Sequence, residues 1–143
     1  MPTRKASARW EGELKTGNGT FKGESGSIGG KYNWSRFEDA TDGTNPEELL
    51  AAAEASCFSM ALSGGLGKNG TPPTSIETDA ACTVSPVEGG FSINKMHLDV
   101  RAVVPGIDDA KFQEIANATL TGCPVSKTFK GNVDITLNAR LTQ

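Results

Sequence analysis

The chain has 143 residues, a net charge of −3 at pH 7 and 36% hydrophobic residues, with 17 glycines. This length fits a single domain covering residues 1–143. A pI near 5.2 leaves no excess of Lys and Arg for phosphate contacts, so nucleic-acid binding is excluded as a function class. Because few large side chains are available to fill a core, association of two copies would add core volume.

No apolar run follows the first residues, so we expect no secretory signal, and no segment is expected to reach the ~20 apolar residues of a membrane span. The protein is therefore expected in the cytoplasm, where thiols are kept reduced. Its three cysteines are then expected to be reactive, or simply buried, rather than joined in structural disulfides.

Three strands are expected in the first third of the chain. Residues 6–11 alternate between apolar and polar side chains, which is typical of a half-buried strand. Gly17-Asn18-Gly19 favours a hairpin turn before a second strand over 20–25. Gly29-Gly30 indicates another turn, and a third strand is expected over 31–38.

The third strand places Arg36 on the same face as Tyr32 and Trp34. Arginine is unusual among aromatic side chains. Either it extends outward along Trp34, or it is held inward for a purpose. The residues alone leave both readings open.

A long helix is expected from Glu47 to about Leu66. Asn45 suits the N-cap, Pro46 the first helical position, and Glu48 can close a capping box. The segment is apolar or small nearly all round, which predicts a central helix buried on all sides. The face expected to point inward contains Leu50, Ala53, Cys57, Met60 and Ala61.

The remaining elements complete an α+β domain. We expect strands over 76–85 and 91–104, a helix over 110–120 capped by Asp108 or Asp109, a short helical turn after Cys123-Pro124, and a last strand over 133–141. The order βββ-α-ββ-α-β indicates antiparallel sheets with helices packed on them.

Two residue types that could carry out chemistry, histidine and the third cysteine, are expected to have no catalytic role. His97 shares a strand face with charged residues and is expected to be solvated, which argues against a Ser-His-Asp or Cys-His site. The cysteines lack the close C-x-x-C spacing of a zinc site, so no metal is expected. Cys82 lies on the apolar face of its strand and is assigned to the core.

Local sequence does not decide whether the other two cysteines are reactive or structural. Pro124 at a first helical position makes Cys123 an N-cap, where the helix end favours a thiolate, although Cys123 could also merely fill a helix junction. Cys57 lies in the middle of the long helix, where burial alone would make it inert. To react, Cys57 needs a cation nearby. Arg36, if its side chain is held inward, is the candidate for that cation.

Two motifs resemble a known family. Residues 44–53 followed by Ser56-Cys57-Phe58 resemble the central motif of the OsmC/Ohr family of hydroperoxide reductases, and Gly122–Ser126 resembles its second cysteine motif. The segments 32–37, 74–78 and 104–107 also resemble the OsmC branch. Ohr-type proteins carry an arginine in the first hairpin, whereas residues 17–21 have none, which again favours OsmC.

The resemblance implies an OsmC-like fold, an intertwined homodimer and a peroxidase mechanism. Cys57 would attack an organic hydroperoxide, and Cys123 would capture the sulfenic acid as a disulfide. Arg36 would stabilise the thiolate and the peroxide, and Glu47 would orient Arg36. No metal or organic cofactor is implied. An external dithiol would reduce the disulfide, with a lipoyl-type dithiol as one candidate.

Helix geometry predicts how the two chains of the dimer would pack. Glu47 precedes Cys57 by ten residues, so on one straight helix they lie about 15 Å apart and roughly 80° out of phase. The two cannot share a small site within one subunit unless the helix bends. We therefore expect two central helices to pack antiparallel about a two-fold axis, with Glu47 of one chain near Cys57 of the other.

Two other functions compete with the peroxidase. A general thiol–disulfide oxidoreductase usually has adjacent C-x-x-C cysteines, which this chain lacks. A non-catalytic, stress-induced carrier could bind small apolar ligands in a groove at the dimer interface. Peroxide consumption in the presence of a dithiol separates the three.

Overall fold

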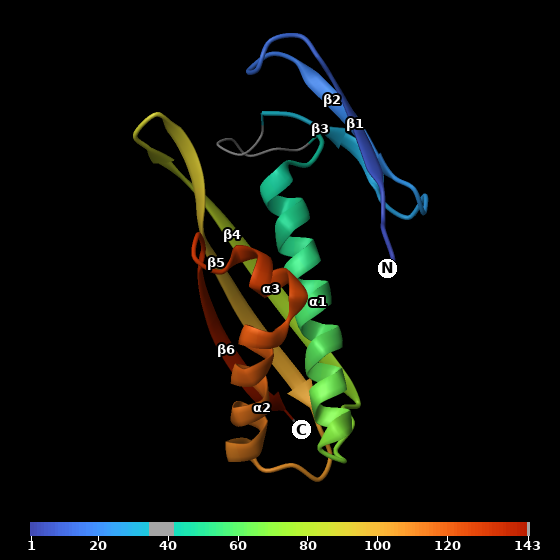
Figure 1. The fold of residues 1–143 in the computed structure, drawn as a ribbon, viewed down its shortest axis with the longest axis vertical. Helices are drawn as coiled ribbons and strands as arrows, with labels where there is room; N and C mark the ends of the chain where they lie inside the picture. Colours follow the sequence, from blue (N-terminus) through green and yellow to red (C-terminus); the bar gives the residue numbers. More distant parts are fainter. Residues whose placement is uncertain (35–41, 143) are drawn as a thin grey trace. The chain divides into compact units, whose positions relative to one another are not determined.

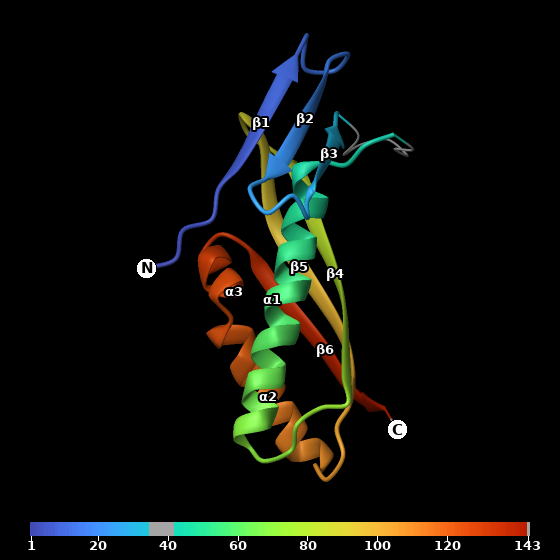
Figure 2. The ribbon, with the colours of Figure 1, turned by 90° about the vertical axis from the view of Figure 1, so that its right-hand side faces the viewer.

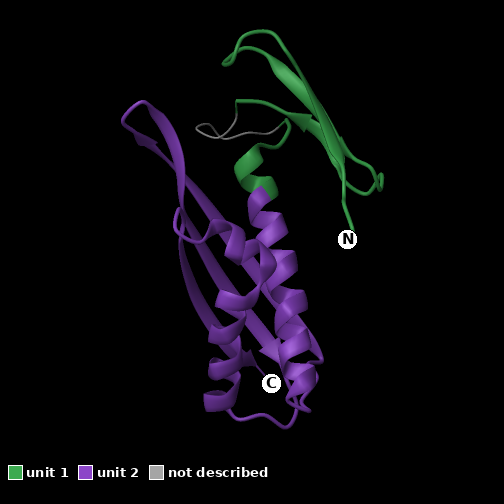
Figure 3. Cartoon of the chain, in the orientation of Figure 1, with its two compact units in different colours: residues 1–49 green, residues 50–143 purple. Residues whose placement is uncertain are grey.

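The computed structural model describes residues 1–34 and 42–142. The chain forms two compact units, residues 1–49 and residues 50–143 (Figure 3), which are described in turn. The α+β class and the expected order of elements are confirmed, with the short helical turn after Cys123 present as a separate helix.

The first unit contains an antiparallel sheet in the order β1-β2-β3 (Figure 1). The strands are β1 (Ala6–Glu11), β2 (Asn18–Gly23) and β3 (Gly29–Tyr32). Trp10 and Tyr32 pack with ring centroids 5.4 Å apart across Gly19, where an added Cβ would lie 2.5 Å from the Tyr32 ring. A glycine is therefore needed beneath this aromatic pair.

Both turns predicted at glycine pairs lie at other residues in the structure. Asn18 and Gly19 already belong to β2, and the chain reverses over residues 12–17. Gly29 and Gly30 belong to β3, and the preceding reversal covers residues 24–28. Residues 6–9 are exposed rather than half-buried. Arg36 and the second half of the predicted strand 31–38 lie outside the described residues.

In the second unit the helices lie on one face of a sheet (Figures 1 and 2). The helices are α1 (Pro46–Lys68, of which residues 50–68 belong to this unit), α2 (Asp109–Gly122) and α3 (Pro124–Phe129). The sheet has the order β4-β5-β6, formed by β4 (Ser75–Val87), β5 (Gly90–Val103) and β6 (Asp134–Thr142). On its other face His97 is exposed, as expected, and Arg101 pairs with Asp79 at 3.0 Å.

The second sheet is mixed, which corrects the expectation of purely antiparallel sheets. β4 and β5 pair antiparallel, but β5 and β6 pair parallel, with Leu98 opposite Leu137. The physical reason is the connection. The chain between β5 and β6 forms α2 and α3 across one face and returns to start β6 in the direction of β5, as a helical crossover does.

Helix α1 begins as its sequence predicts. The Asn45 side chain accepts a hydrogen bond from the Glu48 backbone N–H at 2.9 Å, and Pro46 occupies the first helical position. Asp108 caps α2 in the same way, accepting from the Lys111 backbone N–H at 2.8 Å.

The inward face of α1 differs from the predicted one. Phe58, Leu62 and Leu66, spaced four residues apart, are fully buried in the core with residues of β5 and α2. Met60 is 77% exposed, and Ala53 is exposed as well. The expectation of a helix buried on all sides is therefore not met within one chain, because the large side chains alone select the packed face.

By length and composition α1 also qualifies as a possible membrane span, with a mean hydropathy of 1.4. The sequence expectation that no segment comes near this limit was therefore wrong. A core helix of a soluble protein passes the same test, and α1 contributes its row of large side chains to the core.

Replacing Phe58 by Ala is expected to lower the free energy of unfolding by about 3–5 kcal/mol, because it leaves a cavity in the core. Phe91, 48% exposed on β5, provides the matched control, and Phe91→Ala should cost less than about 1 kcal/mol. Urea unfolding at one fixed protein concentration checks both. Equal losses for the two variants would contradict the packing described here.

Candidate active site

Cys57 and Cys123, 66 residues apart in the sequence, meet in the second unit. Their sulfur atoms lie 2.8 Å apart, in hydrogen-bonding contact, and both are free thiols. Cys57 is half-buried on α1, whereas Cys123 is fully buried at the junction of α2 and α3. Two thiols in contact can form a disulfide, which needs a sulfur–sulfur bond of about 2.05 Å.

Local sequence places Cys123 at this junction. Its backbone N–H closes the last turn of α2 on the Thr119 carbonyl at 2.9 Å, and Pro124 then starts α3 with Cys123 as the N-cap. The predicted N-cap position is confirmed. Cys82 is half-buried against the core cluster, as its assignment to the core predicts.

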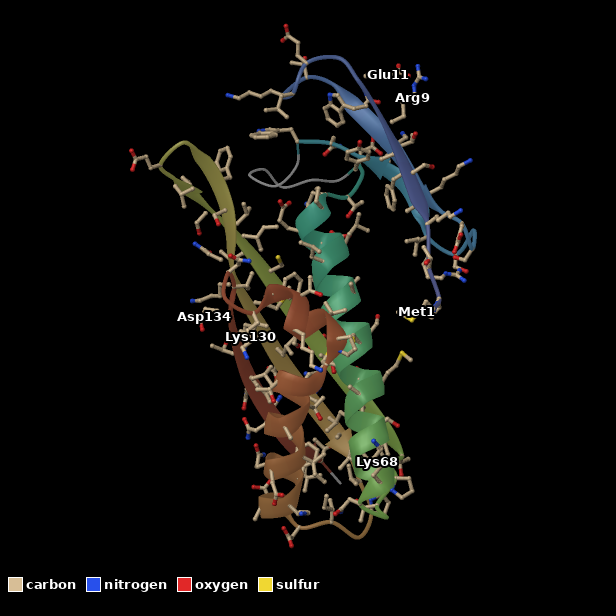
Figure 4. All side chains as sticks on the ribbon, viewed as in Figure 1. Met1, Arg9, Glu11, Lys68, Lys130 and Asp134 are labelled. Carbon is tan, nitrogen blue, oxygen red and sulfur yellow. The ribbon has the colours of Figure 1, made fainter. Side chains whose placement is uncertain are left out.

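Burial raises the pKa of the Cys57 thiol. The neighbouring Cys123 sulfur and the negative charge that Glu54 would carry raise this pKa further. Among the described residues, only a hydrogen bond from the Val125 backbone N–H lowers it. The basic side chain of α1, Lys68, lies at the far end of the helix (Figure 4). These surroundings favour the thiol over the reactive thiolate.

A buried carboxyl group lies beside the two sulfurs. Glu54 is fully buried, and its Oε1 accepts a hydrogen bond of 2.5 Å from the Ser126 hydroxyl of α3. Its Oε2 is buried and has no hydrogen-bond partner among the described residues. Burial raises the pKa of Glu54, although the Ser126 hydrogen bond opposes the shift. This environment favours the neutral carboxylic acid.

Sequence reasoning found the two cysteines but missed Glu54, Val125 and Ser126. A usable signal was present. Glu54 is a charged residue in an otherwise apolar stretch of α1, and it precedes Cys57 by three residues, while Ser126 follows Cys123 by three. Residues three apart in a helix share one face.

The structure does not test whether the other two predicted site residues join this cluster. Arg36 lies outside the described residues. Glu47 is the second residue of α1 and is buried, but it belongs to the first unit. No group of three or more His, Cys, Asp or Glu side chains that could hold a metal ion occurs among residues 1–34 and 42–142.

Comparisons with known proteins show which family the chain belongs to. Residues 38–138 match the family described as OsmC-like protein. The chain is 45% identical over 139 residues to a protein named peroxiredoxin OsmC from Escherichia coli (strain K12), covering 96% of each. It is 35% identical over 97 residues to an organic hydroperoxide resistance protein from Xanthomonas axonopodis pv. citri, covering 67% of this chain and 66% of that one.

A solved structure gives the same result for the fold. The organic hydroperoxide resistance protein OhrB of Bacillus subtilis matches with a TM-score of 0.76 at 30% identity, covering 96% of this chain and 98% of that one. The OsmC-like fold expected from the two cysteine motifs is thereby confirmed. The chain belongs to the OsmC-like protein family.

Proposed function

We propose that the chain is a thiol-dependent peroxidase that reduces organic hydroperoxides, and hydrogen peroxide more weakly, to alcohols or water. The observation that carries this proposal is the 2.8 Å contact between the Cys57 and Cys123 sulfurs. Relatives named peroxiredoxin OsmC and organic hydroperoxide resistance protein support an enzyme of this class. Its biological role would be defence against oxidative or osmotic stress in the cytoplasm.

The chemistry uses sulfur alone. The Cys57 thiolate attacks the distal oxygen of the hydroperoxide, the O–O bond breaks, and the alkoxide leaves as the alcohol after taking up a proton. Cys57 becomes a sulfenic acid, which Cys123 converts to a disulfide with loss of water. An external dithiol, with a lipoyl-type dithiol as one candidate, then returns both thiols.

Cys57 is the peroxidatic residue and Cys123 the resolving one in this scheme. Half-exposed Cys57 is the sulfur that a hydroperoxide can reach, because Cys123 is fully buried. Their contact lets the sulfenic acid be captured before further oxidation carries it beyond rescue.

Substituting Cys57 by Ser should abolish peroxide consumption down to the background rate of the dithiol, because the nucleophile is lost. Cys123→Ser should consume one equivalent of hydroperoxide and then stall or overoxidise. Cys82→Ser, which removes the third cysteine, is the control and should keep activity. The assay follows tert-butyl hydroperoxide, with dithiothreitol as the reductant for turnover and without it for the single-equivalent measurement on Cys123→Ser.

The result also separates the competing functions. A wild type that consumes no hydroperoxide would reject the peroxidase and leave the carrier of small apolar ligands. Activity that survives Cys57→Ser would place the reaction elsewhere in the chain.

Arg36 is proposed as the cation that offsets the unfavourable surroundings of the Cys57 thiolate, with Glu47 orienting it by a charge-assisted hydrogen bond. The support is electrostatic. Burial, Cys123 and Glu54 all raise the pKa of Cys57, so a peroxidatic cysteine here needs a positive charge to react at neutral pH.

Arg36→Ala should therefore shift the pH dependence of Cys57 alkylation upward. Alkylation follows the thiolate fraction, so its midpoint lies at the pKa, and losing a nearby cation should move that midpoint up by about one to three pH units. Iodoacetamide kinetics in a Cys82→Ser, Cys123→Ser background isolate Cys57. Arg9→Ala is the control, because Arg9 is exposed and pairs with Glu11. Identical midpoints for Arg36→Ala and this control would contradict the role.

A homodimer is the proposed assembly, with two central helices packed antiparallel so that Glu47 of one chain serves Cys57 of the other. Two features support it. Glu47 and Cys57 lie ten residues apart on the sequence of α1, about 15 Å along a straight helix. Within the second unit, α1 also exposes small side chains and Met60 opposite its core face, which a second helix could approach closely.

Mixed dimers test the shared site. Glu47→Ala and Cys57→Ser chains, each inactive alone, should regain activity when unfolded and refolded together. With random pairing, half of the dimers are mixed and each has one complete site, so about a quarter of wild-type activity is expected. If Glu47 serves the Cys57 of its own chain, the mixture stays inactive. A monomer in light scattering with full activity would equally reject the dimer.

A further inference from the structure

Glu54 is an unusual residue for the interior of this unit. It is 0% exposed, and its hydrogen-bond partner Ser126 is 3% exposed. No cation pairs with Glu54 among the described residues, and Oε2 lacks a hydrogen-bond partner there. Burying an ionised carboxylate in this way is costly, whereas a neutral carboxylic acid with one strong hydrogen bond is far less so. A glutamate at such a position calls for a structural or chemical reason.

The positions of Glu54 and Ser126 relative to the cysteines supply one. Glu54 lies one helical turn before Cys57 on α1, and Ser126 lies one turn after Cys123 on α3. Two side-chain contacts therefore join the same two segments, sulfur to sulfur at 2.8 Å and hydroxyl to carboxyl at 2.5 Å. A third contact joins the same segments: the Val125 backbone N–H donates a hydrogen bond to the Cys57 sulfur.

Helix α3 is short, and few of its side chains are buried. It has six residues, and apart from Ser126 only Phe129 within it is buried. A segment this short is not a stable helix on its own. The hydrogen bond to Glu54 is thus one of three contacts that join the start of α3 to α1, beside the sulfur–sulfur contact and the Val125 N–H.

We propose that Glu54 is a positioning residue whose neutral carboxyl group, by accepting the Ser126 hydrogen bond, holds the start of α3 against α1 and keeps the Cys123 sulfur in reach of Cys57. This inference rests on the proposed peroxidase function. It assigns Glu54 to the second step, in which the Cys123 thiol gives up its proton and its sulfur bonds to the Cys57 sulfur. The S–O bond of the sulfenic acid breaks, and its oxygen leaves as water.

The two steps of the reaction should depend on Glu54 to different degrees. Attack on the hydroperoxide uses Cys57 and its activating groups, of which the Val125 N–H is the described one on α3, so it should depend on Glu54 less than disulfide formation does. Disulfide formation needs the Cys123 sulfur in place, so it should depend strongly on the hydrogen bond. When capture is slow, the sulfenic acid survives longer and a second hydroperoxide can oxidise it to sulfinic acid.

The test compares Glu54→Gln, Glu54→Leu and Ser126→Ala with the wild type. Gln keeps the shape and the acceptor oxygen of the neutral acid but carries no exchangeable acid proton. Leu removes the acceptor, and Ser126→Ala removes the donor. Ser59→Ala is the matched control, because the Ser59 hydroxyl joins α1 to Thr78 of β4 at 2.8 Å without touching α3. It removes a similar hydrogen bond elsewhere on the same helix.

Each protein is mixed with one equivalent and then with excess tert-butyl hydroperoxide, quenched with acid at intervals and measured by intact mass. Loss of a hydrogen bond of this kind should slow disulfide formation roughly ten-fold in Glu54→Leu and Ser126→Ala and raise their sulfinic acid fraction. Glu54→Gln and Ser59→Ala should stay within about two-fold of the wild type. The initial rate of sulfenic acid formation should be similar in all five proteins.

Two results would overturn the proposal. If Glu54→Gln is as slow as Glu54→Leu, Glu54 acts through its charge or its proton rather than as an acceptor. If Ser126→Ala forms the disulfide at the wild-type rate, the hydrogen bond does not position Cys123.

Amide hydrogen exchange keeps the proposal testable apart from the peroxidase function. Exchange of the α3 amides should be faster in Glu54→Leu and Ser126→Ala than in the wild type and Ser59→Ala, with no peroxide present. Unchanged exchange in both variants would reject the positioning role. A wild type that consumes no hydroperoxide would instead reject the proposed function while this measurement still decides on Glu54.

Discussion

The contact between the start of α3 and the middle of α1 is the interaction on which the site depends. It brings together two cysteines that are 66 residues apart in the sequence. The fold prepares this contact from both sides. The core residues Phe58 and Leu62 fix the rotation of α1, while the break between α2 and α3 at Cys123-Pro124 ends one helix and starts another with the sulfur at the junction. A disulfide can then form without rearranging the sheet.

Electrostatics in the second unit work against a reactive Cys57. Burial, the adjacent sulfur and a buried carboxyl group all favour the thiol, and among the described residues one backbone hydrogen bond, from Val125, favours the thiolate. This balance explains why the proposed activation needs Arg36. It also explains why Glu54 serves best when neutral, since an ionised carboxylate beside Cys57 would oppose the charge that the reaction requires.

Capping and breaking residues made most of the fold predictable. Asn45-Pro46, Asp108 and Cys123-Pro124 each mark the start of a helix, and the structure has all three. The inward face of α1 was missed because small and apolar residues surround the helix and give no clear periodicity. The parallel pairing of β6 was missed because strand alternation does not report direction, although a long helical connection favours a crossover.

The candidate site was predictable in part for similar reasons. A cysteine after a helix break and a cysteine within a recognisable motif can be identified along the sequence, so the pair was found. The hydrogen bond between Glu54 and Ser126 joins residues 72 positions apart, and only the packing of α3 on α1 brings them together. The sequence indicates this hydrogen bond only through spacing: Glu54 lies three residues from Cys57, and Ser126 lies three residues from Cys123.

Peptide mapping of the oxidised protein shows whether Cys57 and Cys123 form one redox pair. After one equivalent of tert-butyl hydroperoxide, blocking of free thiols and digestion without reductant, we expect one intrachain disulfide joining Cys57 to Cys123, with Cys82 recovered as a blocked thiol. A disulfide that includes Cys82, or Cys57 and Cys123 both recovered as free thiols after the peroxide has been consumed, would contradict it.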